Sequence, residues 1–301
     1  MKIPFAILWL LSGGPAPGSV SSPPAVPALP AATIQTEFSY PDGVALGRDG
    51  SLYVVDTDNS VLKKVSPAGE ITTVLSAGLK YPTGVALGPD GTLYVADAGN
   101  RAVWRLAPTA TVPDKLEGRG FTYPSAVAVA ADGTLYVADA GTASGGSVQK
   151  ISPAGRAEVL AKDLHKPSGL ALGLDGAVYV AESTTNTILR LTPTGHTSVA
   201  AQGLVLDQPH GLAVGTDGVL YVADSYHHRV LTISPTGRVA TLAEGLSYPS
   251  GLAVDAAGTV YVADTGHGML KRVSAAGAVS AVPAPAVDIK ASTAGAPQSK
   301  P

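Results

Sequence analysis

The sequence predicts an all-β fold, a six-bladed β-propeller whose blades are four-stranded antiparallel sheets. A motif recurs six times along the 301 residues, as YPDGVALGRDGSLYVVD, YPTGVALGPDGTLYVAD, YPSAVAVAADGTLYVAD, KPSGLALGLDGAVYVAE, QPHGLAVGTDGVLYVAD and YPSGLAVDAAGTVYVAD. The prolines of these copies are separated by 41, 42, 43, 42 and 40 residues, and a period of about 40 to 45 residues with several strands per copy is typical of propeller blades. No segment longer than about 12 residues combines helical periodicity with helix caps.

Each copy divides into four strands, which the first copy illustrates in order. Residues 44–46 follow a Pro-x-Gly turn and form the innermost strand, where small residues suit strands that converge on an axis. Residues 52–55, LYVV, are all apolar, as expected of a strand covered on both sides by neighbouring blades. Residues 61–65, VLKKV, alternate like a half-solvated strand, and the SPAG turn then leads to the outermost strand, ITTVL, at 71–75.

The ends of the chain predict two segments outside the propeller. Lys2, the apolar run at 3–11 and a stretch rich in Ser, Pro and Ala resemble an export signal with a leader, so residues 1–31 are assigned to such a segment. The apolar run is too short to span a bilayer. We therefore expect a secreted, periplasmic or cell-envelope protein without an integral membrane segment. Residues 32–283 form the propeller, and residues 284–301 read as a disordered tail.

Two segments compete to be the outermost strand of the last blade. Residues 32–39, ATIQTEFS, precede the first Pro-x-Gly turn as an outer strand would, and residues 278–283, AVSAVP, follow the last copy in the same way. A propeller must close because an open ring leaves unpaired strand edges. The sequence leaves open which of the two segments pairs with the last blade.

Composition excludes several classes of function. The net charge of −3 and the charged fraction of 14% provide no basic field for nucleic acid or anionic lipid. The chain has no cysteine, which excludes disulfides and thiolate metal sites. It also has no phosphate-binding loop with its lysine and no G-x-S-x-G turn.

The repeated pattern P-x-G-[VL]-A-[VL]-x-x-x-G-x-[LV]-Y-V-A-D resembles the NHL repeat over residues 38–283. It is most similar to the extracytoplasmic sensor propellers of actinobacterial serine/threonine kinases, which implies a bacterial protein. The Asn-Arg pair typical of NHL repeats after the second strand survives as Asn100-Arg101 and partly as His228-Arg229.

The loops before the first strand and after the second strand of each blade are predicted to open on one face, the top face, where binding residues are expected. The middle residues of the six Pro-x-Gly turns should form a ring around the channel mouth. With the neighbouring loops, the candidate ligand-binding residues are Asp42, Thr83, Ser125, Ser168, His210, Ser250, Tyr226, His227 and His267.

An acidic residue ends the second strand of every copy, at Asp56, Asp97, Asp139, Glu182, Asp224 and Asp264. Because it recurs in every blade, we expect it to be structural and to accept backbone N–H groups of the following turn. Blade three has a longer segment at 140–150, predicted to be a flexible loop on the top face.

His210, His227 and His267 are the candidate ligands for a divalent metal, since all three belong to top-face loops in one sector of the ring. The QPHGL turn also resembles turns of propeller lyases, the streptogramin B lyases and the peptidyl amidating lyases, which implies a metal-binding or acid–base role for His210. Serines stand at the equivalent positions of the neighbouring blades, Ser168 and Ser250. The streptogramin lyase fold also resembles seven blades, whereas this chain has six copies.

The sequence favours a binding or scaffold propeller, a monomer without a required cofactor that acts through its top face. Its ligand would be a protein, a peptide or a cell-envelope component. The alternative is an enzyme, a metal-dependent lyase similar to streptogramin lyase or a lactone hydrolase, that uses His210 as its catalytic residue.

Overall fold

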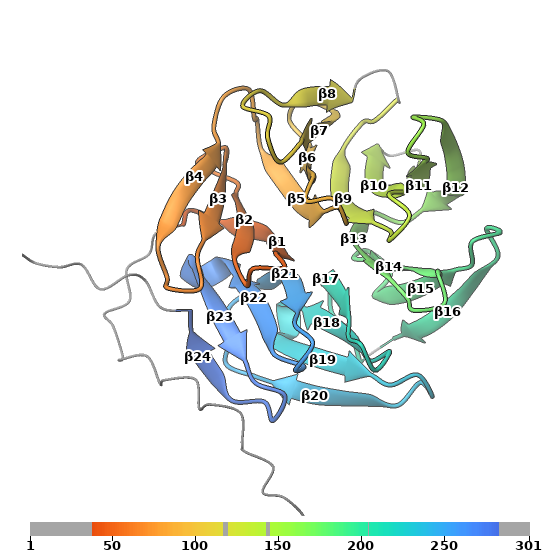
Figure 1. The fold of residues 1–301 in the computed structure, drawn as a ribbon. Helices are drawn as coiled ribbons and strands as arrows, with labels where there is room; N and C mark the ends of the chain where they lie inside the picture. Colours follow the sequence, from red (N-terminus) through yellow and green to blue (C-terminus); the bar gives the residue numbers. More distant parts are fainter. Residues whose placement is uncertain (1–37, 117–119, 143–144, 204, 283–301) are drawn as a thin grey trace, which may run out of the picture. The chain divides into compact units, whose positions relative to one another are not determined.

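The computed structural model describes residues 38–116, 120–142, 145–203 and 205–282, and all of them belong to one compact unit, residues 32–301. The predicted leader at 1–31 and the predicted tail at 284–301 lie outside these ranges. The described residues form the predicted six-bladed propeller, in which each blade is a four-stranded antiparallel sheet. Figure 1 shows the first strand of every blade near the middle of the ring and the fourth at its periphery.

The inner halves of the blades contain the repeated motif. The innermost strands are β1 (Pro41–Leu46), β5 (Pro82–Leu87), β9 (Pro124–Val129), β13 (Pro167–Leu172), β17 (Pro209–Val214) and β21 (Pro249–Val254). The second strands are β2 (Leu52–Asp56), β6 (Leu93–Asp97), β10 (Leu135–Thr142), β14 (Val178–Glu182), β18 (Leu220–Asp224) and β22 (Val260–Asp264).

The outer halves of the blades vary more in length. The third strands are β3 (Val61–Val65), β7 (Ala102–Leu106), β11 (Gly145–Ile151), β15 (Thr187–Leu191), β19 (Arg229–Ile233) and β23 (Met269–Val273). The outermost strands are β4 (Ile71–Leu75), β8 (Asp114–Leu116), β12 (Ala157–Leu164), β16 (Thr197–Gln202), β20 (Val239–Ala243) and β24 (Val279–Ala281).

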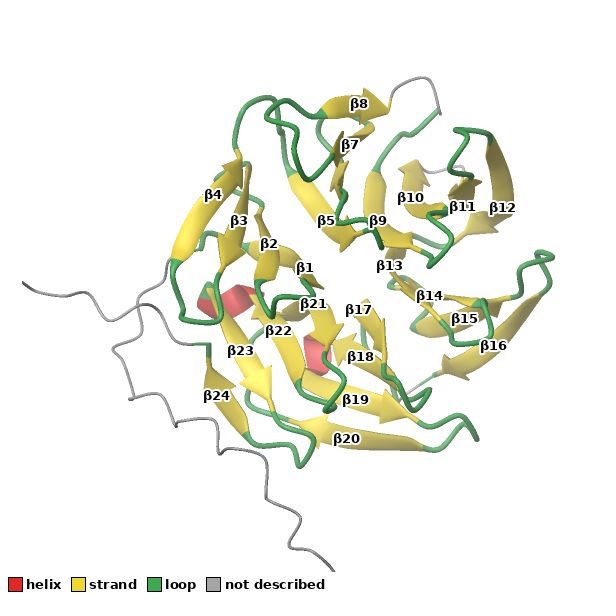
Figure 2. Cartoon of the chain, in the orientation of Figure 1, coloured by secondary structure: helices red, strands yellow, loops and turns green. Residues whose placement is uncertain are grey.

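Within the described ranges, helix is limited to two single 3₁₀ turns, η1 (Ser225–His227) and η2 (Thr265–His267), drawn red in Figure 2. None of the helices in this part of the chain has the length and apolar character needed to cross a membrane.

The core lies between the blades rather than inside them. Six clusters of buried side chains fill the six interfaces, and each cluster combines residues of two neighbouring blades. The second strand serves two clusters at once. Val54 packs in the interface between blades 6 and 1, and the next residue, Val55, packs in the interface between blades 1 and 2. This double coverage explains why the second strands are almost wholly apolar.

The strand register places the Pro-x-Gly turns beside the repeated acidic residues. In every blade the proline that begins the first strand pairs with the acid that ends the second, as Pro41 does with Asp56 and Pro209 with Asp224. The loops that precede the first strand and follow the second therefore share one end of each blade. This arrangement confirms a common top face.

The last blade is completed by β24, which pairs with β23 in register Val273–Val279. Of the two predicted closing segments, the C-terminal one therefore occupies the outer position. Residues 32–37 of the other segment lie outside the described ranges, while the next residue, Phe38, is buried between blades 6 and 1 with Leu270. The ring closes through this packing of blade 6 on blade 1.

Blade 3 departs from the prediction of a flexible loop at 140–150. Strands β10 and β11 continue beyond the length of their counterparts, and they pair as far as Thr142 with Gly145. The longer segment is therefore mainly an extension of the β10–β11 hairpin, because its backbone groups continue the ladder instead of leaving it.

Candidate functional site

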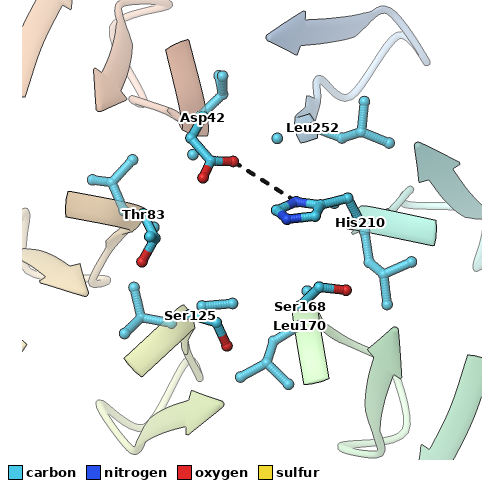
Figure 3. Close-up of a pocket in the computed structure, with 17 residues that line it drawn as sticks. Asp42, Thr83, Ser125, Ser168, Leu170, His210 and Leu252 are labelled. Atoms are coloured by element: carbon cyan, nitrogen blue, oxygen red, sulfur yellow. Dashed lines mark ion pairs between the residues drawn. The ribbon is translucent and has the colours of Figure 1, made fainter. Parts of the chain in front are cut away.

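The middle residues of the six Pro-x-Gly turns surround the channel mouth, as the sequence predicted. Five of them lie around the axis in Figure 3, namely Asp42, Thr83, Ser125, Ser168 and His210. The channel below them is narrow, with a cavity of about 60 Å³. It forms the floor of a larger site above rather than a site of its own.

The glycine of these turns lets neighbouring blades meet at the axis. A side-chain Cβ placed on Gly43 would lie 2.7 Å from Gly84 Cα, and one on Gly169 would collide with the carbonyl oxygen of His210. A larger residue at Gly169 would thus displace the turn that carries His210. The glycines of the first strands are therefore needed for the turns to take up their positions around the channel mouth.

Hydroxyl groups at the mouth join each blade to the next. In blades 2, 3 and 4 the middle residue of the turn donates a hydrogen bond to the proline carbonyl of the following blade. The donors are Thr83 to Pro124 at 2.9 Å, Ser125 to Pro167 at 2.6 Å and Ser168 to Pro209 at 2.9 Å. All three donors are buried. We call these contacts the hydroxyl bridges.

Blades 1 and 5 make the same bridge with a different residue. There the first residue after the second strand is the donor, from Thr57 to Pro82 at 2.8 Å and from Ser225 to Pro249 at 2.6 Å. Blade 6 has both kinds of donor, because Ser250 and Thr265 each donate to Pro41. The middle residues of blades 1 and 5 are consequently released from bridging, and they are Asp42 and His210.

Asp42 and His210 point toward each other at the channel mouth, from the two blades that flank blade 6 (Figure 3). His210 Nδ1 lies 3.7 Å from Asp42 Oδ1, and the two side chains are 35% and 9% exposed, respectively. Burial raises the pKa of Asp42 above the ordinary value, while the neighbouring His210 and a hydrogen bond from Ser250 act in the opposite direction. The pair thus combines a buried carboxyl group of perturbed pKa with an imidazole open to the top face. This is a combination found in general acid–base sites.

A basin of about 670 Å³ lies above the mouth and is lined by residues of all six blades. Asp42 and His210 belong to its floor. The residues before the prolines form its wall, and they are Tyr40, Tyr81, Tyr123, Lys166, Gln208 and Tyr248. The sequence had indicated the floor but not this wall. The signal was visible in the motif itself, since the residue before the proline is tyrosine in four of the six copies.

Tyr226 also lines the basin, as predicted, and packs against the wall. The rings of Tyr226 and Tyr248 pack edge to face, with centroids 5.3 Å apart. The ring of His228 also packs edge to face against Tyr248, with centroids 4.6 Å apart. These contacts fix the aromatic wall at the boundary between blades 5 and 6.

The repeated acids are structural, but their partners differ from those predicted. Asp56, for example, accepts the backbone N–H of Ser39 at 2.8 Å, and Glu182 accepts that of His165 at 2.7 Å. In every blade the donor lies in the loop 17 residues before the acid. Bonds to the following turn are additional, as from Asn100 to Asp97. The acid thus ties the entry of the Pro-x-Gly turn to the end of the second strand.

The three histidines predicted as candidate metal ligands do not come together. His227 Nδ1 lies 2.8 Å from Asp224, and His267 Nδ1 lies 2.8 Å from Asp264, so each is held by the acid of its own blade. His210 instead faces Asp42. Throughout the described residues, no group of three His, Cys, Asp or Glu side chains could hold a metal ion. The donors at the mouth therefore fall short of the three protein ligands usual for catalytic zinc.

Comparisons with known proteins indicate a family. The sequence model of the virginiamycin B lyase family matches residues 74–297, a range that includes His210 but not Asp42. No curated protein sequence matches the chain.

Solved structures show the same fold at low sequence identity. A streptogramin B lyase aligns with a TM-score of 0.66 and 16% identity, covering 81% of this chain and 82% of that one. A gluconolactonase from Xanthomonas campestris aligns with a TM-score of 0.67 and 19% identity, covering 76% and 84%. A catalytically inactive histidine-to-alanine variant of virginiamycin B lyase from Staphylococcus aureus with quinupristin aligns with a TM-score of 0.64 and 16% identity, covering 85% and 87%.

Proposed function

The chain belongs to the virginiamycin B lyase family, and we propose that it binds a small ligand in the basin on its top face. The observation that carries the proposal is the basin itself. Its volume of about 670 Å³ lies within the range of roughly 300 to 1,000 Å³ usual for small-molecule sites. An aromatic wall above a polar floor offers apolar contact together with hydrogen-bonding groups that orient a ligand.

The expected export of the chain and its likeness to NHL sensor propellers are part of the same proposal. A ligand of the cell envelope or the surrounding medium would reach the top face directly. Mass spectrometry of the mature N-terminus tests export, and an intact N-terminus after secretion-competent expression would contradict it.

A thermal-shift screen of small ligands tests the binding proposal. A ligand present at 100 times its Kd should stabilise the folded chain by about 2.7 kcal/mol. We expect Tyr81→Leu to remove the stabilisation, because Tyr81 contributes to the wall of the basin. Asp49→Asn, in the turn between β1 and β2 at the opposite end of the blade, is the matched control and should retain it. Ligands that stabilise both variants equally would place the binding site elsewhere.

We propose a second function, acid–base catalysis on a cyclic ester or lactone, because one observation favours it. His210 is the partly exposed member of the Asp42–His210 pair. It could take a proton from a bound ligand or from water, while the Asp42 carboxylate would stabilise the imidazolium that forms. The histidine-to-alanine variant of the virginiamycin B lyase with quinupristin is described as catalytically inactive, which supports testing a histidine here.

A divalent metal does not fit this second function as the side chains stand. Asp42 and His210 supply one oxygen and one nitrogen ligand, and the remaining middle residues of the turns are neutral hydroxyls. We therefore assign no step to a metal.

Catalysis is separated from binding by His210→Ala. Incubation of streptogramin B and aldonolactone substrates with the wild-type chain should yield product, and the variant should reduce the rate by about 10² or more while ligand-induced stabilisation remains. If both proteins are equally inactive and both bind ligand, the binding function stands alone.

A further inference from the structure

The aromatic wall of the basin is continuous over four neighbouring blades. The residue before the proline is tyrosine in blades 6, 1, 2 and 3, and blade 5 adds Tyr226 beside Tyr248. The exposed fractions are 50% for Tyr40, 43% for Tyr81, 38% for Tyr123, 50% for Tyr226 and 48% for Tyr248. Aromatic rings gathered and half exposed around one concavity are typical of ligand-binding surfaces rather than of ordinary propeller loops.

The conformation of these residues is also unusual. Tyr40, Tyr81 and Tyr248 have φ values of 59°, 55° and 47°. Lys166 and Gln208, which precede the proline in blades 4 and 5, have φ values of 56° and 47°. The left-handed conformation therefore belongs to the repeated turn, although bulky side chains rarely adopt it. The fold keeps the rings at the basin despite this cost.

A single carboxyl group lies below the rings. Asp42 lines the same basin and is 6% exposed. The pKa values of Tyr40, Tyr81 and Tyr123 are raised, mainly by burial and further by the charge of Asp42, to about 12 for Tyr123. The phenols therefore remain neutral at physiological pH, and the rings and the carboxylate share one electrostatic environment.

The carboxylate lacks a permanent counter-ion in the part of the chain that the structure describes. Among the described residues its ion-pair partner is His210 at 3.7 Å, and no described lysine or arginine side chain is paired with it. Lys166, the cation of the wall, belongs to blade 4, which lies across the ring from blade 1. The side of the basin formed by blades 6, 1, 2 and 3 is therefore aromatic and acidic.

We propose that the basin recognises a ligand through an alkylated ammonium group, held against the tyrosines and above the Asp42 carboxylate. Ring faces attract organic cations within about 6 Å of their centroids, and desolvated sites bind them most strongly. The buried Asp42 carboxyl group, when ionised, supplies the full negative charge that the rings alone lack, and a bound cation would favour that ionised form. The inference rests on the proposed binding function, because both concern the same basin.

Choline and its neutral isostere, 3,3-dimethylbutan-1-ol, test the inference by isothermal titration calorimetry on the full chain. The two molecules have the same shape and differ in charge. We expect choline to bind at least roughly tenfold more tightly, which corresponds to 1.4 kcal/mol. Asp42→Asn should weaken choline binding by roughly tenfold and leave the isostere unaffected, whereas the control Asp49→Asn should change neither.

Ring variants separate a cation site from a merely apolar one. Tyr81→Leu should weaken choline binding several-fold, while Tyr81→Phe should retain it because the ring face remains. If thermal unfolding shows that Asp42→Asn does not fold, the two Tyr81 variants still test the inference. Equal binding of choline and the isostere, or an unaltered affinity for choline in Tyr81→Leu, would overturn the inference.

The same measurements separate recognition of an ammonium group from the more general proposal that the basin binds a small ligand. If neither probe binds but a neutral ligand from the thermal-shift screen is lost in Tyr81→Leu, the basin is a ligand site and the ammonium assignment is wrong. If no tested ligand distinguishes Tyr81→Leu from the wild type, both fail.

Discussion

Blades 1 and 5 differ from blades 2, 3 and 4 in the hydroxyl group that joins each to its successor. In blades 2, 3 and 4 the middle residue of the Pro-x-Gly turn is the donor, and in blades 1 and 5 the residue after the second strand takes its place. The two positions that carry ionisable groups at the mouth are those at which a second hydroxyl has taken over the structural contact.

Loss of a bridging hydroxyl should reduce the free energy of unfolding more than any other substitution considered below. Ser225→Ala would leave the buried Pro249 carbonyl without this donor, at a cost of about 1–3 kcal/mol in the free energy of unfolding. His210→Ala should change it by no more than about 0.5 kcal/mol, because His210 makes no bridge. Urea unfolding of both variants measures the difference.

Ser183→Ala is the matched control for this prediction. Ser183 stands at the same place in blade 4 but donates to Lys166 within its own blade, at 3.3 Å, so its loss should cost less than that of Ser225. If His210→Ala were as destabilising as Ser225→Ala, the conclusion that Ser225 joins the blades and His210 does not would be wrong.

The exchange of donors can also be reversed. Thr57→Val should destabilise blade 1, and combining it with Asp42→Thr should recover most of the loss, because the new hydroxyl stands where blade 2 has Thr83. Additive effects of the two substitutions in urea unfolding would contradict the exchange.

An intermediate effect concerns pH. Because burial raises the pKa of Asp42, the folded chain binds this proton more tightly than the unfolded chain. Asp42 therefore favours folding at low pH, and this contribution is lost as the pH rises from roughly 4, the ordinary pKa of Asp, through the higher pKa of the folded chain. Asp42→Asn, which does not titrate, should gain stability relative to the wild type as the pH rises above that value. If the difference in stability between Asp42→Asn and the wild type does not change with pH, the pKa of Asp42 is not raised in the folded chain.

The smallest effect concerns the two histidines that support the repeated acids. His267→Ala should cost up to about 1 kcal/mol, since half-exposed ion pairs contribute little. His227→Ala should cost less, because Arg229 Nε remains 2.7 Å from Asp224. Thermal unfolding at constant pH ranks the two variants, and the reverse order would mean that Arg229 does not share the carboxylate.

The sequence predicted the fold because the repeat supplies the same pattern six times. It also predicted the ring at the channel mouth, since equivalent positions of equivalent turns must surround the axis. It did not predict that Asp42 and His210 approach to 3.7 Å, because that distance depends on how closely the glycines let the first strands converge. The pairing of His227 and His267 with their own acids was likewise a matter of local loop geometry, set by η1 and η2.

The tyrosine wall was missed for a different reason. A tyrosine that recurs before the proline is as much part of the repeat as the proline itself, and repetition favours a structural interpretation. Two copies depart from the pattern, with Lys166 and Gln208 before the proline, and they confine the tyrosines of this position to blades 6, 1, 2 and 3.

Ring closure by packing of blade 6 on blade 1 has a consequence for synthesis of the protein. Every described blade is formed from consecutive strands, so blades can fold one after another as the chain leaves the ribosome. Asp42 is made with the first blade and His210 with the fifth, and only insertion of the sixth blade between them brings their turns together at one opening. The acid–base pair is therefore absent from every partly synthesised ring, and ligand binding in the basin would report that assembly of the propeller is complete.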